Sequence, residues 1–137
     1  MRDIYSKEGI VSTYVDGKII KVIWDVLSNK KALYESCEEQ LKVVKEGDIE
    51  VIIVDVSHAT GTPPMEVQEW FGEVLFPGYK TCPQFKGLVN ILPASAITKM
   101  GAKRWKEQAE SAQFGFKVYE TDSMESAEKA AEDMMNS

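Results

Sequence analysis

The sequence contains little of what nucleophilic, metal-dependent or redox chemistry requires. Its 137 residues include one histidine and two cysteines, Cys37 and Cys82, whose spacing matches neither a zinc site nor a redox pair. No phosphate-binding loop, glycine-rich dinucleotide fingerprint or His-Glu-x-x-His motif is present. We therefore expect no metal and no cofactor, and we expect the protein not to be an enzyme.

Two further absences concern where the protein acts. No stretch approaches about 18 apolar residues, and the first residues lack the apolar run of a signal peptide. The formal net charge of −6 leaves no concentrated basic surface for nucleic acid or an anionic membrane. These features predict a soluble cytoplasmic protein with no integral membrane segment and no nucleic-acid partner.

The sequence does contain alternating strand and helix patterns. Two β-rich runs, 10–15 and 18–24, flank Asp16-Gly17, a dipeptide typical of a hairpin turn. Because strands and helices then alternate, we expect one α/β domain over residues 1–137, with a mainly parallel, mixed five-stranded sheet flanked by four helices. The later strands are expected at 50–56, 86–92 and 114–119, and the helices at 28–46, 62–76, 95–111 and from 122 onward.

Several helix boundaries carry specific signals. Ser28 and Thr62 are hydroxyl residues suited to N-caps. Phe76-Pro77-Gly78 is expected to end the second helix, because proline interrupts the helical hydrogen bonds. Asp122 with Glu125 resembles a capping box at the start of the last helix.

Four features together carry a family resemblance. Ile23-Trp24 ends the second strand, Val54-Asp55 closes the third, Gln68-Glu69-Trp70 lies on the next helix, and the last helix has an alanine-rich stripe. This pattern resembles the STAS-like domains, the fold of bacterial anti-sigma-factor antagonists and of the cytosolic tails of sulfate transporters. It is most similar to a small stand-alone branch of that family. The resemblance implies a non-enzymatic regulatory or protein-interaction module whose partner is another protein.

One element of the family pattern is missing. Phosphorylated antagonists carry Asp-Ser-Ser-Gly or Asp-Ser-Thr-Gly after the third strand, and a partner kinase modifies one of these serines. The corresponding positions here are Pro63-Pro64-Met65-Glu66. The usual phospho-acceptor motif is therefore absent, and the hydroxyls that remain nearby as candidate phosphorylation sites are Ser57, Thr60 and Thr62.

We expect the contact surface at the end of the third strand, in the loop after it and among the aromatic residues that follow. Large rings gather around one helix and its following loop, and any that are exposed together would form a partner surface, a homodimer contact or an apolar ligand pocket. The candidate binding residues are Ser57, His58, Thr60, Thr62, Trp70, Phe76 and Tyr79.

Two alternative functions remain open from the sequence. The fold also resembles lipid-transfer domains of the Sec14 type, so the chain could carry a small apolar or lipid-like ligand in a cavity beneath residues 70–85. The other alternative is a cryptic hydrolase that uses His58 as general base. Against it, Asp55 and Ser57 are expected to point in different directions from an extended strand, which does not favour a catalytic triad.

Overall fold

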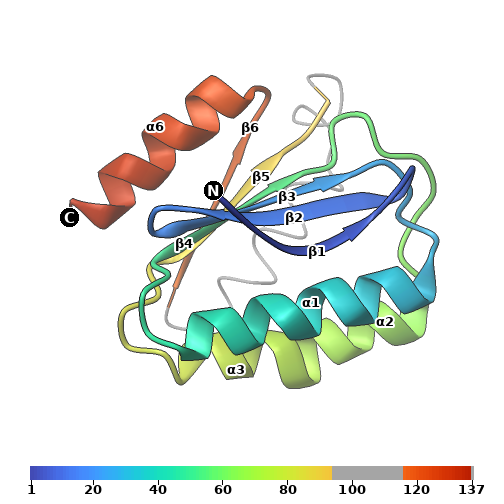
Figure 1. Ribbon diagram of the computed structural model, residues 1–137, viewed down its shortest axis with the longest axis horizontal. Coiled ribbons are helices and arrows are strands. Elements are labelled where there is room, and N and C mark those ends of the chain that lie inside the picture. Colours follow the sequence, from blue (N-terminus) through green and yellow to red (C-terminus); the bar gives the residue numbers. More distant parts are fainter. Residues whose placement is uncertain (94–115, 137) are drawn as a thin grey trace.

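The computed structural model describes residues 1–93 and 116–136. These residues form a six-stranded mixed sheet with helices on both faces (Figure 1), so the predicted α/β class is confirmed. In chain order the elements are β1 (Arg2–Lys7), β2 (Val11–Asp16), β3 (Ile19–Trp24), α1 (Lys30–Lys45), β4 (Val51–Asp55), α2 (Met65–Trp70), the π-helical turn η1 (Phe71–Leu75), α3 (Phe76–Lys80), β5 (Gly87–Ile91), β6 (Lys117–Thr121) and α6 (Met124–Met135).

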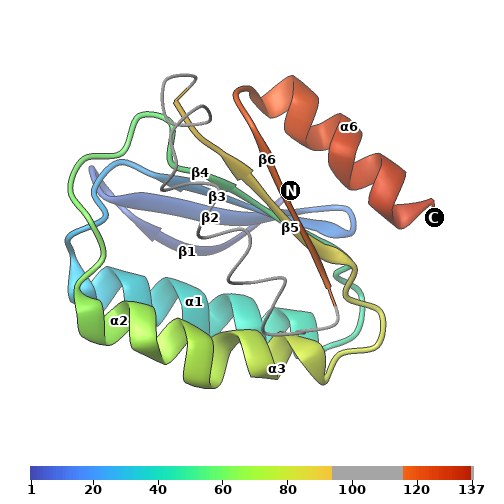
Figure 2. The ribbon, with the colours of Figure 1, turned by 180° about the vertical axis from the view of Figure 1, so that it is seen from behind.

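The strands lie in the sheet in the same order as in the chain. β1, β2 and β3 pair antiparallel, whereas β3, β4, β5 and β6 pair parallel. The helical segments α1 and α2–η1–α3 lie on one face of the sheet, and α6 lies on the other (Figures 1 and 2). The two faces therefore hold two separate cores.

β4 belongs to both cores, which explains its continuous apolar sequence. Ile52 packs in the core under α1 and the α2–α3 segment, whereas Val51 and Ile53 pack under α6. All three side chains are fully buried. A strand covered on both faces has no solvent side on which polar residues could alternate.

α6 is held on its face by small residues and one buried charge. Ala127 and Ala131 are fully buried against the sheet. The Lys21 side chain, on β3, donates from Nζ to Asp16 Oδ2 at 2.9 Å and to Glu128 Oε1 at 3.1 Å, and so joins α6 to the sheet. Burial alone would lower the pKa of Lys21, but the bonds to these two carboxylates raise it, and the amine stays charged.

The strand prediction was wrong in one respect and shifted in another. The sequence indicated five strands and missed β1, whose polar side chains are typical of a sheet edge and lack a clear apolar period. In the predicted hairpin, Asp16 pairs with Ile19, so the turn residues are Gly17 and Lys18, one position later than expected. Gly17 has φ +64°, the left-handed conformation for which glycine is suited.

The predicted helix caps were each displaced along the chain. The cap of α1 is Asn29 rather than Ser28, and its Oδ1 accepts from Ala32 N at 2.9 Å. The cap of α6 is Ser123 rather than Asp122. α2 begins after Pro64 without a side-chain cap, so Thr62 does not cap it.

The second helical segment also runs further than expected. It continues from Met65 through Pro77 to Lys80, and the wide turn η1 lies just before the proline. Within this turn Phe76 N donates to Phe71 O, five residues back. A proline lacks the backbone N–H, and its ring crowds the carbonyl four residues back, so it usually interrupts a helix. We attribute the tolerance of Pro77 within this helical segment to the wider turn before it.

Of the two elements predicted between β5 and the last helix, the structure shows the strand and does not describe the helix. The strand expected near 114–119 is β6, whereas the helix expected over 95–111 lies outside the described residues. Among the helices that are described, none has the length and apolarity needed to cross a bilayer.

Two glycines provide a matched test of the β5–β6 pairing. A Cβ on Gly87 would collide with the backbone oxygen of Lys117 in β6, whereas a Cβ on Gly72 would meet no atom within 4 Å. We expect Gly87→Ala to lower the free energy of unfolding by roughly 3 kcal/mol, and Gly72→Ala to leave it unchanged or raise it by about 0.5–1 kcal/mol. Urea unfolding of both variants measures the difference, and equal stabilities would contradict the pairing.

Candidate functional site

The loop singled out in the sequence lies where β3 and β4 end together. The parallel register pairs Ile23 with Asp55, so the chain leaves both strands side by side. Residues 25–29 then lead to α1, and residues 56–64 lead to α2. The carboxyl ends of parallel strands are the edge at which open α/β sheets place their binding groups.

The loop after β4 is fixed by backbone hydrogen bonds to the segment after β3. Thr60 N donates to Asp25 O at 3.0 Å, and Leu27 N donates to Thr60 O at 2.8 Å. Gly61 has φ +80°, and a Cβ there would lie 3.0 Å from the Cβ of Ser28. The Thr60 hydroxyl also donates to Asp25 O, at 3.3 Å. The loop conformation is therefore set by these hydrogen bonds and by the close approach at Gly61.

Asp55 organises the first residues of the loop. Its Oδ1 accepts from Ser57 N at 3.0 Å and from Ser57 Oγ at 2.6 Å, as in an Asx turn. Among the described residues His58 forms no side-chain hydrogen bond to either of them. The expectation that Asp55 and Ser57 point in different directions was therefore wrong, because residues two positions apart in an extended chain lie on the same side. The structure brings these two residues together but does not join His58 to them as a general base.

The outer surface of the loop is polar, with one apolar side chain beside it. His58, Thr60 and Thr62 are exposed, whereas Ser57 is partly buried. Met65, the first residue of α2, is 69% exposed. Lys30 Nζ and Glu66 Oε1, 2.8 Å apart, connect the starts of α1 and α2 next to this surface.

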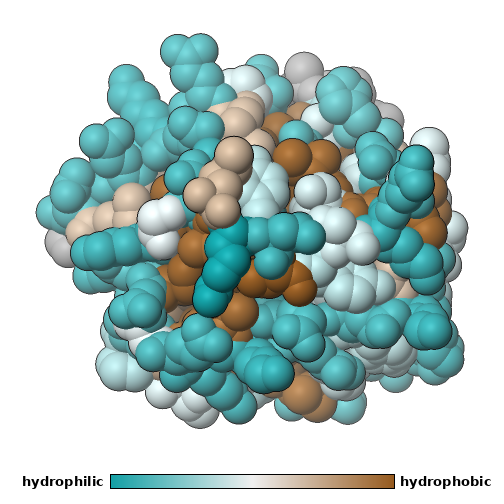
Figure 3. Space-filling model, viewed as in Figure 1, coloured by the Kyte–Doolittle hydropathy of each residue, from teal (hydrophilic) through white to brown (hydrophobic). Residues whose placement is uncertain are grey.

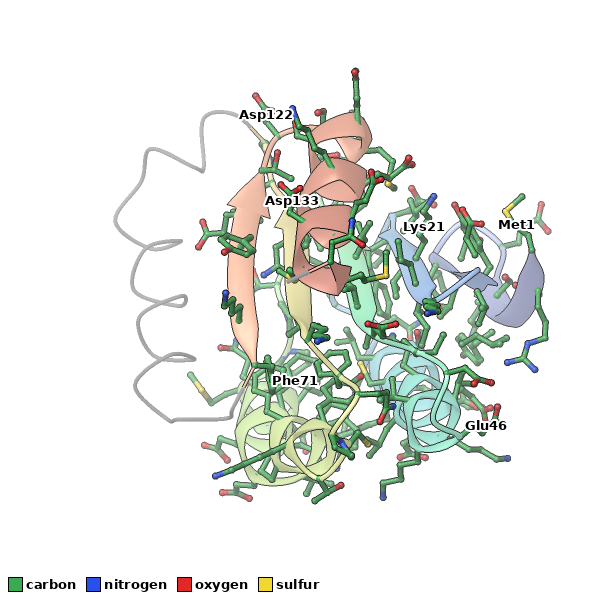
Figure 4. The ribbon with its side chains drawn as sticks, turned by 90° about the vertical axis from the view of Figure 1, so that its left-hand side faces the viewer. Met1, Lys21, Glu46, Phe71, Asp122 and Asp133 are labelled. Carbon is green, nitrogen blue, oxygen red and sulfur yellow. The ribbon has the colours of Figure 1, made fainter. Side chains whose placement is uncertain are left out.

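The aromatic candidates instead form a ladder of rings within the layer between the helices and the sheet, where side chains fill the space (Figure 4). Trp70 and Phe76 are partly buried, and Tyr79 is only 1% exposed, so Tyr79 does not reach the surface. The centroid distances along the ladder are 5.1 Å for Tyr34–Trp70, 5.9 Å for Trp70–Phe71, 6.1 Å for Phe71–Phe76, 6.1 Å for Phe76–Phe116, 5.3 Å for Phe85–Phe116 and 4.9 Å for Tyr79–Phe85.

The buried phenol of Tyr79 is chemically unusual. Its hydroxyl has no hydrogen-bond partner among the described residues. Burial, with the neighbouring Cys37 and Cys82, raises its pKa well above 10. Burial also raises the pKa of the Cys37 thiol to about 12. Both groups are therefore neutral near pH 7, and neither has the properties of a reactive nucleophile.

Two hollows of the described surface both lie away from residues 70–85. One of about 410 Å³ lies between β1 and α1, and the other, of about 380 Å³, lies between β6 and α6. Neither is the cavity beneath residues 70–85 that an apolar-ligand carrier would use. The described residues also contain no group of three or more His, Cys, Asp or Glu side chains placed to hold a metal ion.

Sequence reasoning located the loop but missed the residues that shape it. Asp25 and Leu27 act through a backbone C=O and N–H, which all residue types except proline possess, so their identity gave no signal. Met65 was noted for the missing phosphorylation motif and not as an exposed apolar group.

Scans against protein-family models and searches of curated proteins and of solved structures found no match for this chain.

The hydroxyl of Tyr79, which has no hydrogen-bond partner among the described residues, gives a direct test of the ladder. The substitution Tyr79→Phe removes a buried polar group that lacks a partner and leaves almost no cavity. It should therefore raise the free energy of unfolding by about 1 kcal/mol. Tyr5→Phe is the matched control, because it removes a hydroxyl that donates to Glu35 Oε1 at 3.1 Å and should not stabilise the fold. Thermal unfolding compares the two, and a destabilised Tyr79→Phe would show that the hydroxyl is bonded.

Proposed function

We propose that this chain is a regulatory, non-enzymatic protein-interaction domain of STAS-like type. Its contact surface would be the loop 57–62 together with the exposed start of α2. The observation that carries the proposal is the pair of backbone bonds between Thr60 and the segment after β3, which hold an exposed polar loop in one shape. A loop ordered before binding loses less conformational entropy when a partner docks.

The residues of this surface suit recognition more than chemistry. The side chains of His58, Thr60 and Thr62 would fix the register of a partner by hydrogen bonds, and Met65 would provide an adaptable apolar contact. Trp70 would contribute indirectly. Its ring packs edge-on against Tyr34 and so supports α2, whose first residues belong to the proposed surface.

The STAS-like part of the proposal is supported by where the resembling residues lie. Trp24 ends β3 and is 4% exposed, Asp55 ends β4, and Trp70 ends α2. The alanine-rich stripe predicted for the last helix packs on the sheet as Ala127 and Ala131. These positions agree with the pattern from which the resemblance was drawn.

Regulation by phosphorylation would act differently at the three hydroxyls. Ser57 Oγ already donates to Asp55, so a phosphate there would meet a carboxylate at close range. Thr60 and Thr62 are exposed, and a phosphate on either would place negative charge within the contact surface. Either change would weaken docking of a partner selected for the neutral loop.

A pair of matched substitutions tests the proposed surface. Thr60→Arg places a bulky charge in the loop, whereas Thr81→Arg makes the same change just after α3, at the far end of the same helical segment. We expect Thr60→Arg to reduce recovery of a reproducible partner at least tenfold, measured by quantitative mass spectrometry after purification of the tagged full chain from its own cells. Thr81→Arg should leave that recovery unchanged.

Two results would contradict the proposed surface. One is equal recovery of every partner by both variants, and the other is the absence of any protein that copurifies reproducibly with the unmodified chain. Circular dichroism of both variants shows whether each remains folded, so that a lost partner is not mistaken for a lost fold.

A further inference from the structure

The apolar side chains that α6 places against the sheet are alanines and methionines. The helix contains no Leu, Ile, Val or Phe, and three of the six methionines of the sequence lie on it. Its outer surface is mainly hydrophilic (Figure 3). The side chains that belong to the core on this face are Met124, Ala127, Ala130, Ala131, Met134 and Met135. Because alanine contributes a single methyl group, the larger contacts of this helix come from flexible thioethers.

The sulfur of Met134 rests on a glycine of β5. A Cβ added to Gly87 would lie 3.1 Å from Met134 Sδ, so the sulfur occupies the space that a side chain at position 87 would need. Met134 is 4% exposed, and Val89, in the same core, is fully buried. On the side of the sheet the sulfur is therefore closely packed, and an added oxygen atom would not fit there.

Met134 also borders a hollow that is open to solvent. This hollow, of about 380 Å³, is lined by Lys117 and Tyr119 of β6 and by Ala130, Asp133 and Met134 of α6. Hydrogen peroxide needs little more space than a water molecule and can enter a hollow of this size. Met134 thus combines a packed position in the core with a route from solvent.

Hydrogen peroxide oxidises thioethers without a catalyst. The sulfur lone pair attacks one peroxide oxygen, the O–O bond breaks, a sulfur–oxygen bond forms, and the second oxygen leaves as water after proton transfer. The sulfur is oxidised by two electrons and the peroxide is reduced. The sulfoxide that results is polar, and it disrupts cores and contacts that depend on methionine, since burial of a polar group without a hydrogen bond is unfavourable.

We propose that the methionines of α6 are an oxidation site at which peroxide loosens this helix from the sheet. Sulfoxides at Met124, Met134 and Met135 favour water over the apolar core. The C-terminal half of the helix separates more readily, because Lys21 still binds Glu128 in the first half. The site shares no residue with the proposed contact surface, so this inference does not depend on the proposed function.

The test is oxidation of the full chain by hydrogen peroxide. Peptide mass spectrometry identifies the oxidised methionines, and hydrogen–deuterium exchange of the same sample measures local opening of α6. We expect Met134 to be oxidised after Met65, which is 69% exposed. Exchange of the amides of residues 130–135 should then be at least tenfold faster, whereas exchange in α1, which contains no methionine, should change less than twofold.

Two variants provide matched controls. Met124→Leu/Met134→Leu/Met135→Leu removes the three sulfurs of α6 and keeps the side chains apolar, whereas Met65→Leu leaves those sulfurs in place. Peroxide should accelerate exchange of α6 in the Met65→Leu variant and leave it unchanged in the triple variant. Thermal unfolding before oxidation shows whether each variant is folded.

A further measurement needs no variant and separates sulfoxides from oxidised cysteines. Dithiothreitol alone, which reduces disulfides and sulfenic acids of Cys37 and Cys82, should leave the exchange of α6 fast. Adding methionine sulfoxide reductases for both epimers should return it to the rate of the unoxidised chain.

Three results would overturn the proposal. They are no oxidation of Met134 when Met65 is fully converted, a sulfoxide at Met134 with unchanged exchange in α6, and equal acceleration of exchange in α6 and α1.

Discussion

The structure depends on the burial of β4 on both faces. Val51 and Ile53 anchor α6, and Ile52 anchors the opposite helical layer, so one five-residue strand holds the two cores together. Burying a Val or Ile side chain stabilises a fold by roughly 1.5–3 kcal/mol, and this strand contributes to both cores. Its carboxyl end is consequently held by packing on both faces of the sheet at the point where the loop begins.

The packing of β4 bears directly on the shape of the candidate contact surface. The loop 57–62 leaves β4 directly and is bonded to the segment that leaves β3, so its backbone is fixed at both ends. The loop is thus preorganised before a partner docks.

The sequence predicted the elements that bury apolar side chains periodically or continuously. β4, the hairpin and α1 belong to this group, because their patterns follow from packing. β1 escaped detection because its side chains are polar and its place in the sheet depends on pairing with β2. Tyr79 was expected to be a candidate surface residue, yet the ring stacks on Phe85 in the core, a contact between residues that no local pattern encodes.

The wide turn before Pro77 has a consequence for the face that the second helical segment presents. Val67 and Leu75, eight positions apart, are both buried in the same core. In an uninterrupted α-helix they would differ in direction by about 80°, because each residue rotates the chain by about 100°. One additional residue in the turn reduces this difference to about 20°. The π turn thus corrects the phase of the helix, so that Val67 before the turn and Leu75 at its end can share a single apolar stripe.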